Sequence, residues 1–423
     1  MTQPSLHVVV IGAGIVGAVT AVELLRDGHR VTIIEPGEPG GEQAASYGNA
    51  GGLSTSSVLP VTSPGIWRQV PGFLADPLGP LAISWAYLPR LLPWLWRFVR
   101  AGSTEAKLRR IAPAMRALIA GNPERHLRLA TEAGVPELIR RAGLLYVYPS
   151  RADFAHEAMA WAIRRDNGVT WLELDAGDLH QREPDLDRRY TFGALVEDGG
   201  HCRNPGRYVA ALVALARARG AALLHGNATG FAIDAGRLRA VRLSGGDIEC
   251  DRAVIAAGAR SKVLAKLAGD DVPLETERGY HAMLANPEAE TRRSVGPSDG
   301  KMVHTSMEMG LRCAGQVELA GLDAAPNWQR AAILRDHLIR GFPALPRDLP
   351  ASRVKVWMGH RPSMPDSLPC IGPATLCRDI FHAFGHGHIG LAASAVTGRL
   401  IADLISAKPP LIDPAPYDPA RFR

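Results

Sequence analysis

The stretch from Leu6 to Glu35, LHVVVIGAGIVGAVTAVELLRDGHRVTIIE, restricts the possible folds of this chain more than any other. It opens with a near-continuous apolar run to Ile11, which is typical of a parallel strand covered on both faces. Three glycines follow in G-x-G-x-x-G spacing, and apolar residues then recur at helical spacing until about Arg26. Gly28 stands where a left-handed helix cap is expected, and a second apolar strand ends at Glu35. This order predicts the first strand, helix and strand of a Rossmann-like sheet in an α/β protein.

Each polar or small residue of this unit suits one part of an ADP-containing cofactor. Gly12 permits the tight turn, Gly14 lets backbone N–H groups approach a pyrophosphate, and Gly17 lets the helix pack closely on the strand. The carboxylate of Glu35 accepts hydrogen bonds from ribose hydroxyls and repels a 2′-phosphate, so NADP is disfavoured. The alternative is a βαβ unit whose glycine turn binds nothing. The predicted cofactor contacts here are Gly12, Gly14, Ile15, Val16, Gly17 and Glu35.

Composition limits the class of protein. The chain has 423 residues, enough for a large core and two domains, and its net charge of +6 comes from basic residues spread along the chain. Without a dense basic run or a nucleic-acid motif, no nucleic-acid partner is expected, whereas an anionic substrate or membrane face is compatible. The five cysteines are scattered without C-x-x-C spacing, which argues against a disulfide framework or metal site. Because the first strand begins almost at once, no signal peptide is expected. Because no run reaches about 18 consecutive apolar residues, no spanning helix is expected either, and the predicted location is cytoplasmic.

Two segments follow Glu35 with contrasting composition. The loop GEPGGEQAASYGNAGGLSTSS is rich in small residues that let backbone approach a flat ligand, so Asn49, Ala50 and Gly51 are predicted cofactor contacts, with a plain surface loop as the alternative. The segment from Val61 to about Arg100 carries four tryptophans among leucine, proline and arginine. Such a stretch, above all Trp85 to Phe98, suits a membrane interface, and packing in the core or a lid is the alternative. The tryptophans are Trp67, Trp85, Trp94 and Trp96.

The rest of the chain reads as mixed strands and helices. Helical segments are predicted from 103 to 132, broken at Pro113 and Pro123. The run AVIAAGARS, with Ala257 and Gly258, predicts a second crossing of the dinucleotide sheet. The run SMEMGLRCAGQVELAG alternates like a strand that turns into another at 314–315. Near the end, the pattern predicts a strand at 380–384, a glycine–histidine turn at 385–390 and an alanine-rich helix to 405. The N-terminus of that helix, with the close backbone before it, suits a flavin.

Taken together, these motifs resemble the D-amino-acid dehydrogenase branch of the FAD-dependent amino-acid oxidase family, which includes glycine oxidase and sarcosine oxidase. The resemblance covers nearly the whole chain and rests on the glycine fingerprint, YGNAGGLS, AVIAAGARS, GYH, MEMGLRCAGQVE, GHRPSMPDSLPCIG and FGHGHIGL. It implies noncovalent FAD in a discontinuous Rossmann-like FAD-binding domain (1–60, 198–265 and 352–423). It also implies an inserted mixed β-sheet substrate-binding domain (61–197 and 266–351).

The resemblance also directs attention to site residues. Arg361 in GHRP matches the arginine that holds the substrate carboxylate in glycine oxidase-like relatives, and its fork suits a carboxylate. A surface ion pair is the alternative, and Arg312 is a weaker candidate. Tyr280 and His281 are expected over the substrate, with a packed tyrosine as the alternative. His388 is the further predicted catalytic residue, and the remaining predicted cofactor contacts are Gly385, His386, Gly387, His388, Ile389 and Gly390. No metal is expected, because the HGH turn lacks neighbouring acidic or cysteine ligands.

The implied reaction is oxidative deamination of a small amino or imino acid, with the D configuration expected. Hydride transfer from Cα to flavin N5 gives an imino acid, which water hydrolyses to a 2-oxo acid and ammonia. A cyclic imino acid such as D-proline is a plausible substrate, and a quinone or the respiratory chain at the inner membrane face is the expected electron acceptor. The alternatives are an oxygen-using amino-acid or sarcosine-type oxidase and a flavin subunit of a larger dehydrogenase complex. An NAD enzyme is disfavoured, because the GHGHIG turn would then lack a purpose.

Overall fold

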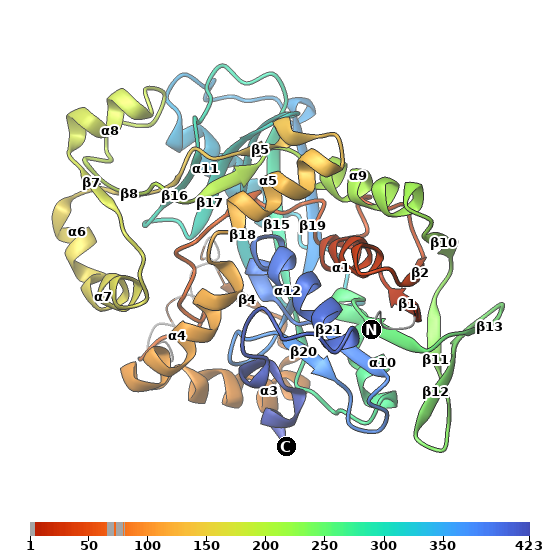
Figure 1. Ribbon diagram of the computed structural model, residues 1–423. Helices are drawn as coiled ribbons and strands as arrows, with labels where there is room; N and C mark the ends of the chain where they lie inside the picture. The colour runs from red at the N-terminus through yellow and green to blue at the C-terminus, as the bar shows by residue number, and fades with distance from the viewer. Residues whose placement is uncertain (1–4, 66–71, 73–78, 80) are drawn as a thin grey trace.

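The computed structural model describes residues 5–65, 72, 79 and 81–423, and two large sheets form its frame (Figure 1). The first sheet has the strand order β10-β2-β1-β14-β21-β20, in which β20 is antiparallel to β21 and the other neighbours are parallel. Its strands are β1 (His7–Ile11), β2 (Arg30–Glu35), β10 (Ala222–His225), β14 (Arg252–Ile255), β20 (Cys370–Pro373) and β21 (Ile380–Phe384). This arrangement confirms the predicted Rossmann-like sheet and the second crossing through AVIAAGARS.

The βαβ unit forms where the sequence predicts it. Helix α1 (Ile15–Arg26) follows β1 directly, and Gly28 after it has a φ of +87°, a left-handed conformation that favours glycine. The Gly12 N–H donates to the Ile34 carbonyl at 2.8 Å, which ties the glycine turn to the end of β2. The carboxyl ends of β1 and β2 therefore open beside the N-terminus of α1, where phosphate groups bind in such folds.

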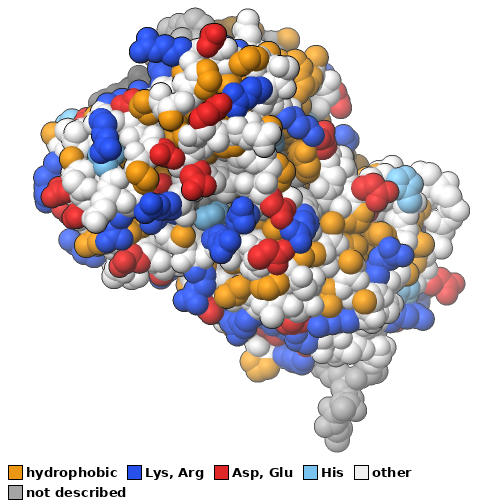
Figure 2. All heavy atoms as spheres, turned by 90° about the horizontal axis from the view of Figure 1, so that it is seen from above, with side chains coloured by type: hydrophobic (Ala, Val, Ile, Leu, Met, Phe, Trp, Pro, Cys, Tyr) orange, Lys and Arg blue, Asp and Glu red, His pale blue; other side chains and the backbone are white. Residues whose placement is uncertain are grey.

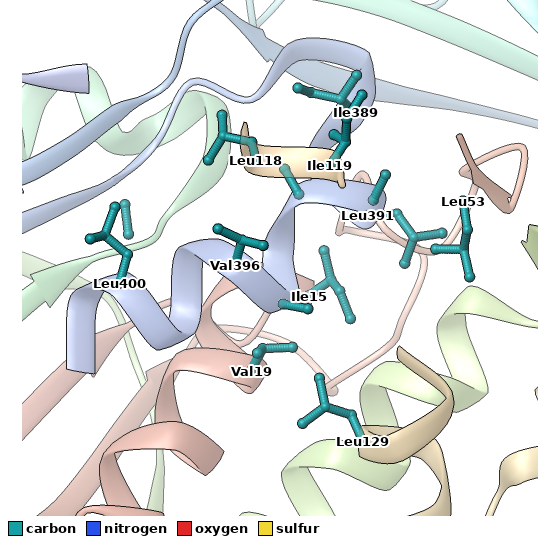
Figure 3. Packing of buried hydrophobic residues seen from close by; sticks show 14 of the residues in the cluster. Ile15, Val19, Leu53, Leu118, Ile119, Leu129, Ile389, Leu391, Val396 and Leu400 are labelled. Carbon is teal, nitrogen blue, oxygen red and sulfur yellow. The ribbon is translucent and has the colours of Figure 1, made fainter. Parts of the chain in front are cut away.

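The last long helix is the centre of the main hydrophobic core. Helix α12 (Gly390–Ile405) lies between α1 and α4 (Glu105–Ile119), and it also contacts α5 (Asn122–Glu132). Figure 3 shows Ile15 and Val19 of α1 on one side of α12 and Leu118 of α4 on the other. The segment Gly387–Ile405 is long and apolar enough to cross a membrane, but 78% of its apolar 18-residue window is buried inside the protein. This core therefore accounts for its apolar surface.

The second sheet is mixed and has the order β19-β15-β18-β17-β16-β6-β8-β7, with β4 beside β18. The β16–β6 and β18–β4 pairs are parallel and the other pairs are antiparallel. Helix α11 (Gln329–Gly341) packs on it. Its strands are β4 (Leu81–Ile83), β6 (Leu144–Tyr148), β7 (Leu172–Leu174), β8 (Phe192–Val196), β15 (Glu275–Leu284), β16 (Ser294–Pro297), β17 (Met302–Met307), β18 (Gly310–Leu319) and β19 (Val354–Ser363).

Smaller elements surround this frame. Two three-stranded sheets are β3-β9-β5 (Gly52–Leu53, Gly200–Cys202 and Ile139–Arg140) and β11-β12-β13 (Ala228–Asp234, Arg237–Leu243 and Gly246–Glu249). The other α-helices that the structure describes are α3 (Leu88–Ala101), α6 (Arg151–His156), α7 (Ala158–Asp166), α8 (Ala176–Arg182), α9 (Pro205–Ala218) and α10 (Ser261–Leu267). Lysine and arginine alternate with acidic residues over the face in Figure 2, in keeping with the dispersed basic charge.

Two local predictions are wrong. Pro113 does not break the helix, because α4 continues through it while Leu108, Ala112 and Met115 are buried. The packing of that face outweighs the hydrogen bond that proline cannot donate. The predicted turn at 314–315 is also wrong: β18 runs straight through these residues, and the chain reverses at 308–309, just before Gly310 with its φ of +134°.

The division into domains stays a prediction. Helices α4 and α5 belong by residue number to the predicted substrate-binding domain, yet they pack against α12 of the predicted FAD-binding domain. The two parts therefore share a continuous core at this point.

Candidate active site

A single cavity of about 1590 Å³ joins the glycine turn to the mixed sheet. Its wall includes the first turn of α1, the loop after β2, the end of β14 and the turn before α12. Residues of β15, β18 and β19 line the same cavity. Segments more than 300 residues apart therefore contribute to the same space, as the resemblance implied.

The three fingerprint glycines have distinct local roles. A Cβ on Gly12, whose φ is +105°, would lie 2.5 Å from the Ala256 carbonyl oxygen, and a Cβ on Gly17 would lie 1.9 Å from the Gly12 carbonyl oxygen. These two glycines are required for the turn and for helix–strand contact. Gly14 is different: a Cβ there would meet only the Ser46 hydroxyl at 3.6 Å, and the residue lines the cavity. Ile15 and Val16 also line the cavity, whereas Gly17 does not.

Glu35 lies at the cavity wall with its carboxylate held by backbone donors. Oε2 accepts from the Ala13 N–H at 2.7 Å and Oε1 accepts from the Gly37 N–H at 3.2 Å. The side chain is 8% exposed and lines the cavity beside the glycine turn. Its remaining lone pairs can accept from the hydroxyls of a ribose.

The loop after β2 is fixed by a buried arginine. Asn49 and Ala50 line the cavity, and Gly51 stands behind them with its N–H bonded to the Asn49 side chain at 2.8 Å. Arg312 is 1% exposed and donates to the Tyr47 carbonyl at 3.2 Å and the Asn49 carbonyl at 2.5 Å. Arg312 therefore shapes the loop and is not among the residues that line the cavity.

The two histidines of the C-terminal turn face different environments. His386 is 2% exposed and its Nε2 hydrogen-bonds with the Thr397 hydroxyl of α12 at 3.0 Å. The His388 side chain is exposed to the cavity and has no hydrogen-bond partner among the described residues. Desolvation, with a contribution from the Arg361 charge, lowers the pKa of His388 to about 4, so its imidazole is neutral at pH 7.

The predicted cofactor contacts after β14 and in the turn before α12 fall into two groups, those that line the cavity and those that do not. Those that line the cavity are Ala257, Gly258, His386, Gly387, His388 and Gly390. Gly385 and Ile389 lie behind them, and Gly385 has a φ of +89° that the turn requires. Cys370 is fully buried and lies outside the cavity lining, and noncovalent cofactor binding stays a prediction.

Arg361 lines the cavity on β19, where its guanidinium is held by backbone carbonyls. Nη1 donates to the Gln316 carbonyl at 2.9 Å and Nη2 donates to the Gly315 carbonyl at 3.3 Å. A Cβ on Gly279 of β15 would lie 2.3 Å from Cζ of Arg361, so only glycine leaves room for this side chain. Desolvation lowers the pKa of Arg361, but an arginine remains a cation at neutral pH.

Tyr280 and His281 are committed to other partners. The Tyr280 hydroxyl donates to the Glu318 carboxylate and accepts from the Asn327 N–H at 3.0 Å. His281 is 1% exposed, hydrogen-bonds with the Gly48 carbonyl at 3.2 Å and stacks on Trp357 with ring centroids 5.3 Å apart. Tyr280 lines the cavity, whereas His281 does not.

Many of the lining residues are not among those predicted from the sequence, and three of them stand out here. Trp357 covers His281, Glu277 stands opposite Arg361 in the β15–β19 register, and Arg164 enters from α7. The sequence held a signal for Glu277. It stands two positions before Gly279 on the same expected strand, and residues two apart on a strand share a face.

The cavity fits FAD by its own features. Gly14 leaves open space at the N-terminus of α1, Glu35 offers carboxylate acceptors at the end of β2, and Gly258 is open toward the cavity because a Cβ there would meet nothing within 4 Å. Residues near the C-terminal turn continue the same space toward Arg361. The volume of about 1590 Å³ leaves room for a small substrate beside a dinucleotide.

Comparison with known proteins agrees with this site. The family model described as FAD dependent oxidoreductase matches residues 7–404. The chain is 59% identical to a D-amino-acid oxidase of Bradyrhizobium diazoefficiens over 98% of this chain and 99% of that protein. It is 30% identical to a D-amino acid dehydrogenase of Paramagnetospirillum magneticum over 96% of each.

Solved structures show the same fold. The L-proline dehydrogenase of P. horikoshii superposes with a TM-score of 0.74 at 20% identity, covering 99% of this chain and 98% of that one. The glycine oxidase of Geobacillus kaustophilus gives 0.71 at 21% identity, covering 98% of each. With a family model that spans nearly the whole chain and a cavity whose residues suit a dinucleotide, this protein belongs to the FAD dependent oxidoreductase family.

Proposed function

We propose that this FAD-dependent oxidoreductase catalyses the oxidative deamination of a small D-amino or D-imino acid. The observation that carries the proposal is the continuous cavity from the glycine turn to Arg361. The D configuration is supported by the 59% identical relative, which is named a D-amino-acid oxidase. FAD, when bound, supplies the acceptor for the hydrogen and the electron pair that leave the substrate Cα.

The chain's own residues position the substrate. Arg361 is pinned by two backbone carbonyls, so its remaining N–H groups can hold a carboxylate without a change of side-chain conformation. Trp357 and Gly359 form the neighbouring surface, which suits a small side chain. Neutral His388 offers a hydrogen bond from the opposite turn, and its low pKa makes it a weak base.

Anaerobic reduction of the bound flavin tests this function. The holoenzyme should be bleached by several D-amino acids and not by their L enantiomers, and N-methylglycine serves as the comparison for a sarcosine-type oxidase. Bleaching by L-amino acids or N-methylglycine alone would contradict the proposed substrate class.

We also propose that the reduced enzyme passes its electrons to a quinone or the respiratory chain at the inner membrane face, with the enzyme on the cytoplasmic side. Helix α3 and Trp85, which lies just before it in the chain, support this partner. Trp85, Leu92 and Trp96 are 73%, 55% and 69% exposed, and Arg90, Arg97 and Arg100 beside them are exposed as well. Such a surface suits an anionic membrane. Leu91 and Trp94 point the other way and are buried against Leu319, while Trp67 lies outside the described residues.

Molecular oxygen is the second candidate acceptor. The specific observation in its favour is the name of the 59% identical relative, a D-amino-acid oxidase. Rates of reoxidation by oxygen and by a soluble quinone analogue, measured on the reduced holoenzyme, separate the two. A quinone rate that does not exceed the oxygen rate would favour the oxidase.

A further inference from the structure

One buried carboxylate in the active-site cavity has no role in the proposed function so far. Glu277 on β15 lines the cavity and is 5% exposed. The register of the β15–β19 pair places it directly opposite Arg361, with Gly279 opposite Gly359 next along the strands. Because paired residues in an antiparallel ladder point to the same face, Glu277 and Arg361 share the cavity side of the sheet.

Neighbouring carboxylates in this part of the sheet are already paired. Glu275 accepts from the Tyr87 hydroxyl at 3.0 and 3.1 Å, and Glu318 accepts from Tyr280 and lies 3.3 Å from Nη1 of Arg278. Glu277 makes no ion pair within 4.0 Å among the residues that the structure describes. Burial raises its pKa, and the Arg361 charge and the Ser363 hydroxyl oppose that shift. A buried carboxylate without an ion partner is costly and is characteristic of a functional site.

The cation and the anion lie on neighbouring strands without forming an ion pair within 4.0 Å. Arg361 is anchored to the carbonyls of Gly315 and Gln316, so it cannot close onto Glu277 without losing those bonds. An α-amino acid carries its carboxylate and ammonium on the same carbon, and these charges match a neighbouring arginine and glutamate.

We propose that Glu277 binds the substrate ammonium group while Arg361 binds the substrate carboxylate. This inference rests on the proposed function, since it assigns the second charged group of the same substrate. The competing role is structural: Glu277 would only offset the Arg361 charge. In that role its removal would change the binding of every carboxylate alike, whether or not the ligand carries an amine.

A pair of ligands that differ only in the amine separates these roles. 2-Aminoisobutyrate and pivalate have the same shape, with an ammonium in one where the other has a methyl group, and neither has a hydrogen on Cα to lose. Their dissociation constants are measured on the FAD-loaded enzyme from the change in the flavin absorption spectrum. The quantity of interest is the ratio of the two constants in the wild type, in Glu277→Gln and in the control Glu275→Gln, whose side chain lies outside the cavity lining.

Glu277→Gln should reduce the preference for 2-aminoisobutyrate over pivalate by about tenfold to a hundredfold, the range of a lost charge-assisted hydrogen bond. Glu275→Gln should leave the ratio unchanged. If Glu277→Gln loses FAD, Glu277→Asp takes its place, and a severalfold reduction is expected from the shortened reach.

An unchanged ratio in the Glu277 variant would overturn the proposal, and so would a wild-type enzyme that does not bind 2-aminoisobutyrate. The dissociation constants of both ligands are measured without turnover, so these outcomes are independent of the bleaching experiment. A holoenzyme that binds the pair as expected but is not reduced by D-amino acids would contradict the proposed function alone.

Discussion

At the scale of single residues, the three fingerprint glycines look equivalent in the sequence but differ in what surrounds them. A Cβ would fit without a backbone collision only on Gly14, while a Cβ on Gly12 or Gly17 would collide with backbone. We therefore predict that Gly14→Val folds but does not retain FAD, because its side chain takes the space that a pyrophosphate needs.

The matched comparison is Gly17→Ala, in which the new Cβ would lie 1.9 Å from the Gly12 carbonyl oxygen. It should lower the midpoint of denaturant unfolding of the apoprotein, whereas Gly14→Val should not. Flavin absorbance after purification and circular dichroism read the two effects separately. A yellow Gly14→Val protein with full FAD content would contradict the cofactor assignment.

Arg361 carries the second residue-scale prediction. Arg361→Ala should lower kcat/KM for amino acids by about a hundredfold or more, because it removes charge-assisted hydrogen bonds worth roughly 1.5–3 kcal/mol each. FAD content should stay near normal. Arg361→Lys should recover only part of the loss, since an ammonium lacks the fork that binds both carboxylate oxygens. Wild-type kcat/KM in the alanine variant would refute the carboxylate role.

At the scale of elements, α3 has one face in the core and one in solvent. The protein should float with vesicles that contain phosphatidylglycerol at low salt and should be released at high salt, because screening weakens the attraction of Arg90, Arg97 and Arg100. Replacing both Trp85 and Trp96 with serine should reduce flotation severalfold. Leu376→Ser, which changes an apolar side chain that is 58% exposed elsewhere, is the control. If the wild-type protein does not float with these vesicles at low salt, the proposed membrane contact of α3 is wrong.

At the scale of the whole molecule, buried histidines make stability depend on pH. Desolvation lowers the pKa of several histidines that are at most 3% exposed to about 3 or 4: His126, His201, His281, His304 and His386. The unfolded chain, with histidine pKa near 6.5, binds more protons below that pH. Stability is therefore present above pH 6.5 and falls as the pH drops, by roughly 1 kcal/mol per histidine at pH 5.5.

Glu183 acts in the opposite direction, because burial raises its pKa to about 7, and its contribution grows as the pH falls toward 4.5. Burial raises the pKa of Glu277 in the same direction. These are two carboxylates against five histidines, so the midpoint of guanidinium unfolding should be lower at pH 5.5 than at pH 7.5. Neither ring nitrogen of His304 has a hydrogen-bond partner among the described residues, and His304→Leu should reduce the pH-dependent loss of stability by about 1 kcal/mol. An equal or higher midpoint at pH 5.5 would contradict this account.

Local order along the chain determined much of what the sequence could predict. The βαβ unit, the helix α1 from Ile15 to Arg26 and the strand at Ile380–Phe384 are where the pattern placed them. Neighbouring residues decide such elements through spacing, glycine turns and caps, so one pass along the chain contains the information. The same motifs, through the family they resemble, also identified FAD as the cofactor.

Only the tertiary structure decided which side chains remain available for chemistry. Tyr280 is occupied by Glu318, a residue 38 positions away, and His386 is taken by Thr397 while His388 is left facing the cavity. Glu277 meets Arg361 through the register of two strands that are far apart in the chain. Strand register and helix packing choose these partners, because the free energy of burying a polar group depends on what the rest of the fold brings beside it.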